Sequence, residues 1–121
     1  MSKRILIVDD SLLIRKLVSF MLRDRGYDVV TAVDGRDALG KLDDLQADMV
    51  VTDLNMPHVN GIELIKQMRR RAAYKFTPVV MLTAESREII MQEGNAAGAN
   101  GWIMKPFTSE NLIETVKKFI Q

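Results

Sequence analysis

The sequence contains no cysteine, so disulfide bonds, thiolate zinc sites and cysteine nucleophiles are excluded. Its single histidine, His58, follows Met56-Pro57 in a predicted loop and is better explained as a surface residue than as a phosphate relay or metal ligand. Long apolar runs are also missing, because the first one, residues 5–8, ends at Asp9, far short of a signal peptide or a membrane span. We therefore expect a cytoplasmic protein that is neither exported nor inserted into a membrane.

Charge of one sign is not in excess either. Seventeen Lys and Arg against sixteen Asp and Glu give a net charge of +1, so no long-range field draws the protein toward nucleic acid or an anionic membrane. The densest basic run, Arg69-Arg70-Arg71 with Lys75, lies at the end of a predicted helix, where it complements the helix dipole and is usually solvated. We expect neither nucleic acid nor membrane as a partner.

The apolar residues predict an α/β domain. Of the 121 residues 47% are hydrophobic, enough for one core. Short, continuous apolar runs predict strands covered on both faces, over 5–8, 29–31, 49–52, 79–82 and, more weakly, 101–104. Between the strands, apolar residues recur at helical spacing and predict five helices. The first begins at a cap, Ser11, and ends at Gly26, and the others cover 35–42, 61–71, 86–97 and 109–120. Five strand-helix units in this order predict a doubly wound, five-stranded parallel sheet.

The pattern contains no internal repeat, low-complexity tract or linker. We therefore expect residues 1–121 to form a single domain without an output domain, so that its output is through its own surface. Gly94 lies inside the fourth predicted helix, where it costs about 1 kcal/mol relative to Ala. We expect that helix to be the least rigid of the five.

Polar residues follow four of the predicted strands. Asp9-Asp10 end the first strand, Asp53 the third, Thr83 the fourth and Lys105 the fifth. In an open α/β sheet, ligands bind outside the carboxyl ends of the strands. Three carboxylates, a hydroxyl and an ammonium group are therefore predicted to converge on one edge of the sheet.

Crowded carboxylates repel one another, and a divalent cation with oxygen ligands resolves the conflict. Mg²⁺ is typically held by one or two carboxylates with positions left open for a phosphoryl group, which suits Asp9 and Asp10, with Asp53 also facing the metal. A carboxylate can itself be a nucleophile that forms an aspartyl phosphate, whose charge Lys105 and the Thr83 hydroxyl could stabilise. A single Asp, Thr or Lys at a strand end is usually only a cap or a solvated side chain. The prediction of a phosphoryl site therefore depends on the joint occurrence of these residues at four strand ends.

Four blocks of sequence surround these residues, and they are Ile7-Val8-Asp9-Asp10, Thr52-Asp53-Leu54-Asn55-Met56-Pro57 with Asn60-Gly61, Met81-Leu82-Thr83-Ala84 and Lys105-Pro106-Phe107. Together they resemble the receiver domain of two-component response regulators. The likeness runs from Lys3 to the last helix, with the blocks in family order and spacing. The length and the segment 98–107 look most like the single-domain chemotaxis regulators of CheY type.

The resemblance implies a flavodoxin-like, CheY-like fold with the strand order 2-1-3-4-5. It implies that Asp53 takes a phosphoryl group from the phosphohistidine of a CheA-like histidine kinase, that Asp9 and Asp10 bind Mg²⁺, and that Thr83 and Lys105 contact the phosphoryl group. The protein would then assist its own phosphorylation and dephosphorylation without being an enzyme that turns over a substrate.

The resemblance assigns further roles around the acceptor. The backbone carbonyl of Asn55 would be another metal ligand, and the Lys105-Pro106 peptide bond would be cis. The small side chain of Ala84 would leave the approach to the phosphoryl group open. The side chains of Asn55 and Glu85 would flank that approach and influence the rate at which water removes the phosphate.

Trp102 stands where receivers often carry Tyr or Phe, an aromatic residue that moves inward as the threonine shifts toward the phosphate. Trp is bulkier and its indole N–H needs a partner if buried, so either a switching or a static role is open. We expect phosphorylation to bias the face made by the fourth helix, fifth strand and fifth helix, with Gly94 easing movement of that helix. A monomer would bind a downstream protein there, such as a flagellar motor switch protein or a phosphatase.

Several alternatives remain. Within the family, these are a phosphorelay intermediate, a non-chemotaxis single-domain receiver, and a pseudo-receiver, although all five site positions are filled here. A flavin carrier would share the sheet order, but Asp9-Asp10 would repel the FMN phosphate. A Mg²⁺-dependent phosphatase with an aspartyl nucleophile usually has two acids separated by one residue after the first strand, whereas Asp9 and Asp10 are adjacent here. The absence of GxxxxGKS/T excludes a P-loop nucleotidase.

Overall fold

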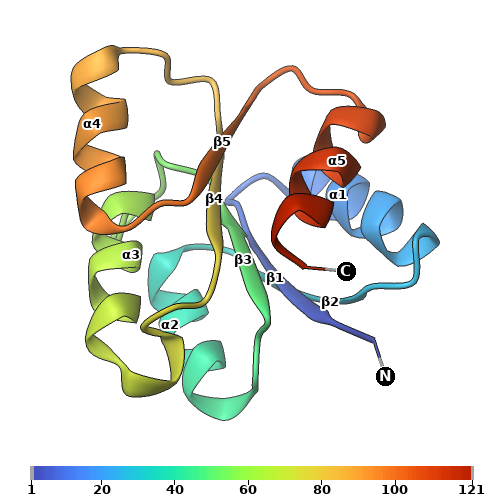
Figure 1. Ribbon diagram of the computed structural model, residues 1–121, viewed down its shortest axis with the longest axis horizontal. Coiled ribbons are helices and arrows are strands. Elements are labelled where there is room, and N and C mark those ends of the chain that lie inside the picture. Colours follow the sequence, from blue (N-terminus) through green and yellow to red (C-terminus); the bar gives the residue numbers. More distant parts are fainter. Residues whose placement is uncertain (1, 121) are drawn as a thin grey trace.

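The computed structural model describes residues 2–120, and a five-stranded parallel sheet lies between two layers of helices (Figure 1). The strands are β1 (Arg4–Val8), β2 (Asp28–Ala32), β3 (Met49–Thr52), β4 (Val79–Thr83) and β5 (Gly101–Met104). The helices are α1 (Leu12–Asp24), α2 (Gly35–Asp44), α3 (Gly61–Arg70), α4 (Glu88–Ala97) and α5 (Ser109–Phe119), with a 3₁₀ turn, η1, at Ala72–Tyr74. The strand order is β2-β1-β3-β4-β5, which confirms the predicted fold.

Alternate residues of each strand face opposite helical layers. In β1, Ile5 and Ile7 join the core cluster that contains residues of α1 and α5, whereas Leu6 and Val8 join the cluster under α2 and α3. All four are at most 1% exposed. This two-sided burial explains why the strands read as continuous apolar runs in the sequence.

Four of the five helices begin at a side-chain cap. The capping residues Ser11, Asp34, Asn60 and Thr108 each accept the backbone N–H of the residue three positions later. Such caps satisfy N–H groups that a helix end leaves without a partner. Within the described residues, none of these helices is long and apolar enough to cross a lipid bilayer.

Helix α4 has no side-chain cap and begins at Glu88, two residues later than the sequence predicts. The preceding segment is held in a turn of its own, because Thr83 Oγ1 accepts the N–H of Glu85 at 3.1 Å and Glu85 Oε2 accepts the N–H of Arg87 at 2.9 Å. Bonds of this kind offer the backbone an alternative to the helix. They exclude Ser86 from the predicted first turn.

Gly94 is explained by packing as well as by propensity. A Cβ atom at this position would lie 2.7 Å from Cζ2 of Trp102, so any side chain here would collide with the indole. The indole Nε1 donates a hydrogen bond of 2.8 Å to Asn95 Oδ1 on the same helix. The half-buried ring therefore has the partner that its N–H requires, and the expected flexibility of α4 is not the only reason for a glycine.

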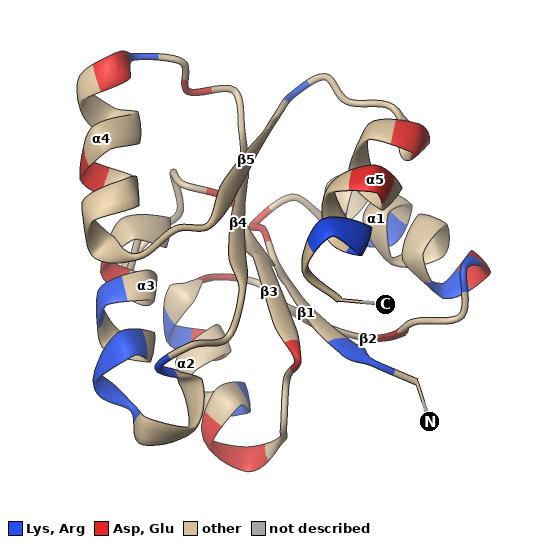
Figure 2. Ribbon diagram, in the orientation of Figure 1, with Lys and Arg blue, Asp and Glu red and all other residues tan. Residues whose placement is uncertain are grey.

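The basic run lies at the end of α3 (Figure 2), and two of its arginines, Arg69 and Arg71, have partners within the fold. Arg69 donates hydrogen bonds of 2.9, 2.7 and 2.7 Å to the carbonyls of Tyr74, Thr77 and Gly98, and burial lowers the pKa of its guanidinium. Arg71 forms an ion pair with Asp43 at 2.9 Å. These bonds tie α3 to its neighbours and account for two of the three arginines without a nucleic-acid partner.

We predict that Tyr74→Phe lowers the free energy of unfolding by about 1–2 kcal/mol. The buried Tyr74 hydroxyl lies between the carbonyls of Leu42 and Leu45, at the end of α2, and the variant leaves both without this donor. Urea unfolding followed by circular dichroism measures the loss. Tyr27→Phe is the matched control, because that buried tyrosine makes no hydroxyl hydrogen bond to another described residue. Equal losses in the two variants would contradict the prediction.

Candidate functional site

The sheet brings the predicted site residues to one edge. Val8 of β1 pairs with Thr52 of β3, so the residues that follow them, Asp9 and Asp53, lie side by side. Ligand oxygens of Asp9, Asp10 and Asp53 all lie within 4.8 Å of one another. Asp9 and Asp53 are buried, whereas Asp10 is exposed.

Asp9 is bonded through every oxygen atom it carries. Its Oδ2 atom forms an ion pair of 3.0 Å with Lys105 Nζ, and its Oδ1 atom accepts the N–H of Ser11 at 2.9 Å. Its backbone carbonyl accepts a hydrogen bond of 2.8 Å from Arg15 Nη1 on α1. A carboxylate that is only 1% exposed requires such partners, since an unpaired buried charge is very costly.

Asp53 is less fully compensated. Its Oδ1 atom accepts the N–H of Leu54 at 2.8 Å, and its Oδ2 atom lies 3.6 Å from Lys105 Nζ. Burial, followed by the nearby Asp9 carboxylate, raises the pKa of Asp53 above its usual value despite the opposing effects of Lys105 and the Leu54 N–H. The site therefore holds more negative charge than its lysine neutralises.

The donor set fits a hard divalent cation. All three clustered side chains offer carboxylate oxygens, and no nitrogen or sulfur ligand belongs to the group. Mg²⁺ prefers oxygen ligands and typically uses one or two carboxylates. A cation at this position would also relieve the repulsion that raises the pKa of Asp53.

The remaining predicted residues surround the cluster. Thr83 ends β4 and is 1% exposed. Lys105 directly follows β5, and the Lys105-Pro106 peptide bond is cis. Asn55 and Ala84 are exposed in the loops after β3 and β4. Trp102, by contrast, packs against α4 instead of joining the carboxylates.

Sequence reasoning missed a clamp on Glu85. Arg87 Nη2 and Nε lie 2.8 and 2.9 Å from the two carboxylate oxygens of Glu85. The hydrogen bonds from the Arg87 side chain and backbone lower the pKa of Glu85 to about 2, and the pKa of Arg87 is raised in turn. The only signal in the sequence is a pair of opposite charges two residues apart, which is too common to be informative.

A glycine is required at position 61, directly behind Asp53. A Cβ atom there would lie 2.4 Å from the backbone carbonyl oxygen of Asp53 and 3.1 Å from Cα of Leu54. The backbone of α3 can approach Asp53 and Leu54 this closely only without a side chain. The sequence signal was Asn60-Gly61, a helix cap followed by the smallest residue.

Known proteins resemble this chain in sequence. Residues 5–117 match the response regulator receiver domain. Chemotaxis protein CheY-3 of Vibrio cholerae is 43% identical over 119 residues, which cover 98% of this chain and 92% of that protein. CheY of Pseudomonas aeruginosa is 40% identical over 98% of this chain and 96% of its own length.

Solved structures extend the likeness to three dimensions. CheY4 of Vibrio cholerae matches with a TM-score of 0.96 and 45% identity, over 99% of this chain and 100% of that one. A CheY-like receiver from Methanospirillum hungatei gives a TM-score of 0.92 at 28% identity, over 98% of this chain and 93% of that one. Because residues 5–117, nearly the whole chain, match this one family, the chain belongs to the response regulator receiver domain family.

Proposed function

We propose that this protein is a chemotaxis response regulator that accepts a phosphoryl group on Asp53 and signals by phospho-dependent protein binding. The observation that carries the proposal is the cluster of three carboxylates within 4.8 Å, with Lys105 paired to one of them. The relatives named CheY support the chemotaxis role. The donor would be the phosphohistidine of a kinase that uses ATP inside the cell, which gives the protein a cytoplasmic location.

The metal in this proposal is Mg²⁺. The carboxylates of Asp9, Asp10 and Asp53 would hold it, together with the backbone carbonyl of Asn55. When bound, it neutralises charge on the oxygens of the phosphoryl group during transfer.

A carboxylate oxygen of Asp53 attacks the phosphorus atom of the phosphohistidine. The new P–O bond forms as the P–N bond breaks, and the electron pair of that bond stays on the imidazole nitrogen of the kinase. Lys105, held 3.0 Å from Asp9 and 3.6 Å from Asp53, donates to the phosphoryl oxygens. The Thr83 hydroxyl accepts the N–H of Glu85, which leaves its own hydrogen for the phosphoryl group.

A second reaction, hydrolysis of the aspartyl phosphate, removes the phosphoryl group as inorganic phosphate. Water attacks the phosphorus atom, the P–O bond to Asp53 breaks, and the carboxylate is restored. Exposed Ala84 leaves an approach for the water, and the Arg87 clamp fixes the Glu85 carboxylate at the side of that approach. The protein thus assists its own phosphorylation and dephosphorylation.

The output surface is the face of α4, β5 and α5. Ile89 at the start of α4 is 71% exposed, an apolar residue available to a partner. Movement of Thr83 toward the phosphoryl group would pull on the Glu85 N–H and so on the turn before α4. Phosphorylation then favours the conformation in which Thr83 contacts the phosphoryl group best. A ligand shifts the equilibrium between two conformations only if it binds one of them more tightly than the other.

We predict that Asp53→Asn raises the free energy of unfolding at pH 7 in the absence of Mg²⁺. Because the folded-state pKa of Asp53 is raised, ionising this group costs stability as the pH rises through that pKa. Below about pH 3 the group is largely protonated in both states, so the advantage of the variant disappears. Urea unfolding at the two pH values measures the difference. An advantage that grows as the pH falls would contradict the assigned pKa shift.

We predict that Lys105→Gln slows phosphorylation of Asp53 by about a hundredfold. The variant removes the ammonium group that lies beside Asp9 and Asp53, while keeping a side chain of similar length. The mass gain from acetyl phosphate with Mg²⁺ measures the rate, and circular dichroism checks the fold. Lys66→Gln, which changes an exposed lysine of α3, is the control and should react normally. Equal rates in the two variants would rule out a role for Lys105 in transfer.

We predict that beryllium fluoride, a mimic of the aspartyl phosphate, changes the fluorescence of Trp102 in a saturable manner. Trp102 is the only tryptophan and packs on α4, next to the proposed output face. The change should require Mg²⁺ and disappear in Asp53→Asn. A silent Trp102 together with no mass gain from acetyl phosphate would overturn the phospho-acceptor proposal and favour a pseudo-receiver.

A further inference from the structure

A groove of about 600 Å³ runs between α1 and the edge strand β2, within the size range of small-molecule sites. None of the clustered carboxylates lines it. One wall is a stripe of α1 at helical spacing, and Thr31 of β2 lies opposite. The stripe includes Leu12, Arg15, Lys16, Ser19, Phe20 and Arg23.

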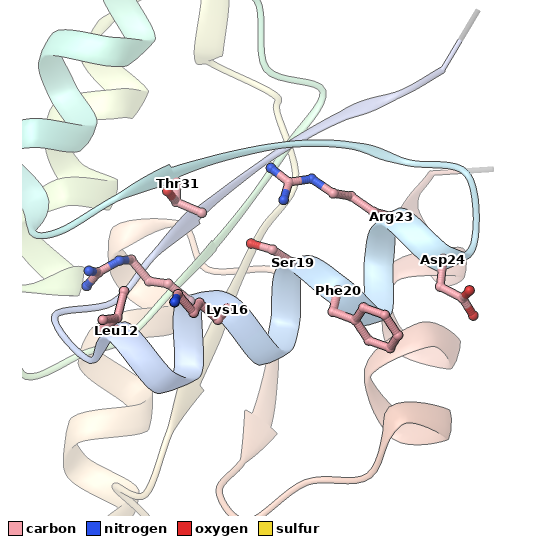
Figure 3. Close-up of a pocket in the computed structure, with 8 residues that line it drawn as sticks. Leu12, Lys16, Ser19, Phe20, Arg23, Asp24 and Thr31 are labelled. Carbon is pink, nitrogen blue, oxygen red and sulfur yellow. The ribbon is translucent and has the colours of Figure 1, made fainter.

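Ser19 carries a buried hydroxyl that lacks a partner. The residue is 4% exposed, and its Oγ atom makes no hydrogen bond to any other described residue. Figure 3 shows the hydroxyl directed from α1 toward β2, between Thr31 and Arg23. A serine inside a helix commonly bonds to a carbonyl of the preceding turn, and an unsatisfied buried hydroxyl is costly. This one therefore has an unused donor at the wall of the groove.

Three cations line the groove, with Arg15 bonded at its Asp9 end and Arg23 at its Val29 end. Arg15 Nη1 and Arg23 Nη2 each donate one hydrogen bond to a backbone carbonyl, those of Asp9 and Val29, at 2.8 and 2.9 Å. These bonds fix the two guanidinium groups and leave most of their five N–H donors for other acceptors. Lys16 is exposed and has no ion pair within the described part of the chain. The arrangement favours an anion with several acceptor oxygens, such as a phosphate group.

The remaining surface of the groove suits an apolar or aromatic group. Phe20 and Leu12 are 70% and 58% exposed although both are large and apolar. Asp24 is the only carboxylate of the lining, and Figure 3 shows it beyond Phe20, directed away from Ser19. A flat ring could pack on Phe20 while its phosphate reaches the cations.

We propose that the groove between α1 and β2 binds a small organic phosphate carried on a planar ring, the chemistry of a mononucleotide. Lys16 and Arg23 bind the phosphate, Ser19 donates to it, and Phe20 packs on the ring. The site is separate from Asp53, so this proposal does not depend on the phospho-acceptor function.

Nuclear magnetic resonance titration tests the proposal, with adenosine monophosphate as the probe and no Mg²⁺ present. Amide signals of residues 12–24 and 31 should shift in a saturable manner, with a dissociation constant about tenfold or more below those of inorganic phosphate and adenosine alone. Inorganic phosphate that binds as tightly as the nucleotide would overturn the ring-bearing ligand. The absence of saturable shifts up to about 10 mM of all three probes would overturn the site.

Variants separate a binding role from a structural one. Lys16→Gln should weaken nucleotide binding about tenfold, while Lys66→Gln, an exposed lysine of α3, should leave it unchanged. Ser19→Ala should also weaken binding but should raise the midpoint of thermal unfolding, because it removes an unsatisfied buried hydroxyl. Normal binding in both Lys16→Gln and Ser19→Ala would contradict the proposal.

Discussion

The ion pair between Lys105 and the buried Asp9 carboxylate is the interaction on which this site depends. It joins residues 96 positions apart, at the ends of the first and last strands. One ammonium group serves two carboxylates, at 3.0 Å from Asp9 and 3.6 Å from Asp53. Asp9 also has the Ser11 N–H, but Asp53 remains under-compensated, as its raised pKa indicates. The fold thus buries an excess of negative charge, and this excess favours a cation or a phosphoryl group with its metal.

Much of the fold follows from local chemistry that the sequence displays. The alternation of Ile5 and Ile7 with Leu6 and Val8 between two core clusters requires strands that are apolar on both faces. Caps such as Ser11 mark helix starts because their side chains serve only nearby backbone groups. The site was predictable for a related reason. A parallel sheet gathers whatever follows its strands at one edge.

Features that depend on distant contacts could not be predicted. Gly94 looked like a flexible position because the indole that occupies its missing side-chain space comes from another element, β5. Arg69 looked like part of a solvated basic run, yet its partners include Gly98, which is 29 residues away. The late start of α4 arises from the bonds of Glu85 with its neighbours, which compete with helix formation only in the geometry of this loop. The unpartnered Ser19 hydroxyl depends likewise on packing that no spacing rule encodes.

The close contact between Gly94 and Trp102 makes the two ends of α4 unequal in how firmly they are held. Its carboxyl-terminal half is fixed by the indole in the Gly94 socket, by Asn95, and by Arg69, which holds the Gly98 carbonyl at 2.7 Å. Its amino-terminal end has no side-chain cap and continues from the turn beside Thr83. If that end moves, we expect the displacement to be largest at the first turn of the helix and to decrease toward residue 94. Trp102 therefore contacts the part of α4 that we expect to move least, and the first turn of the helix is the part that we expect to move most.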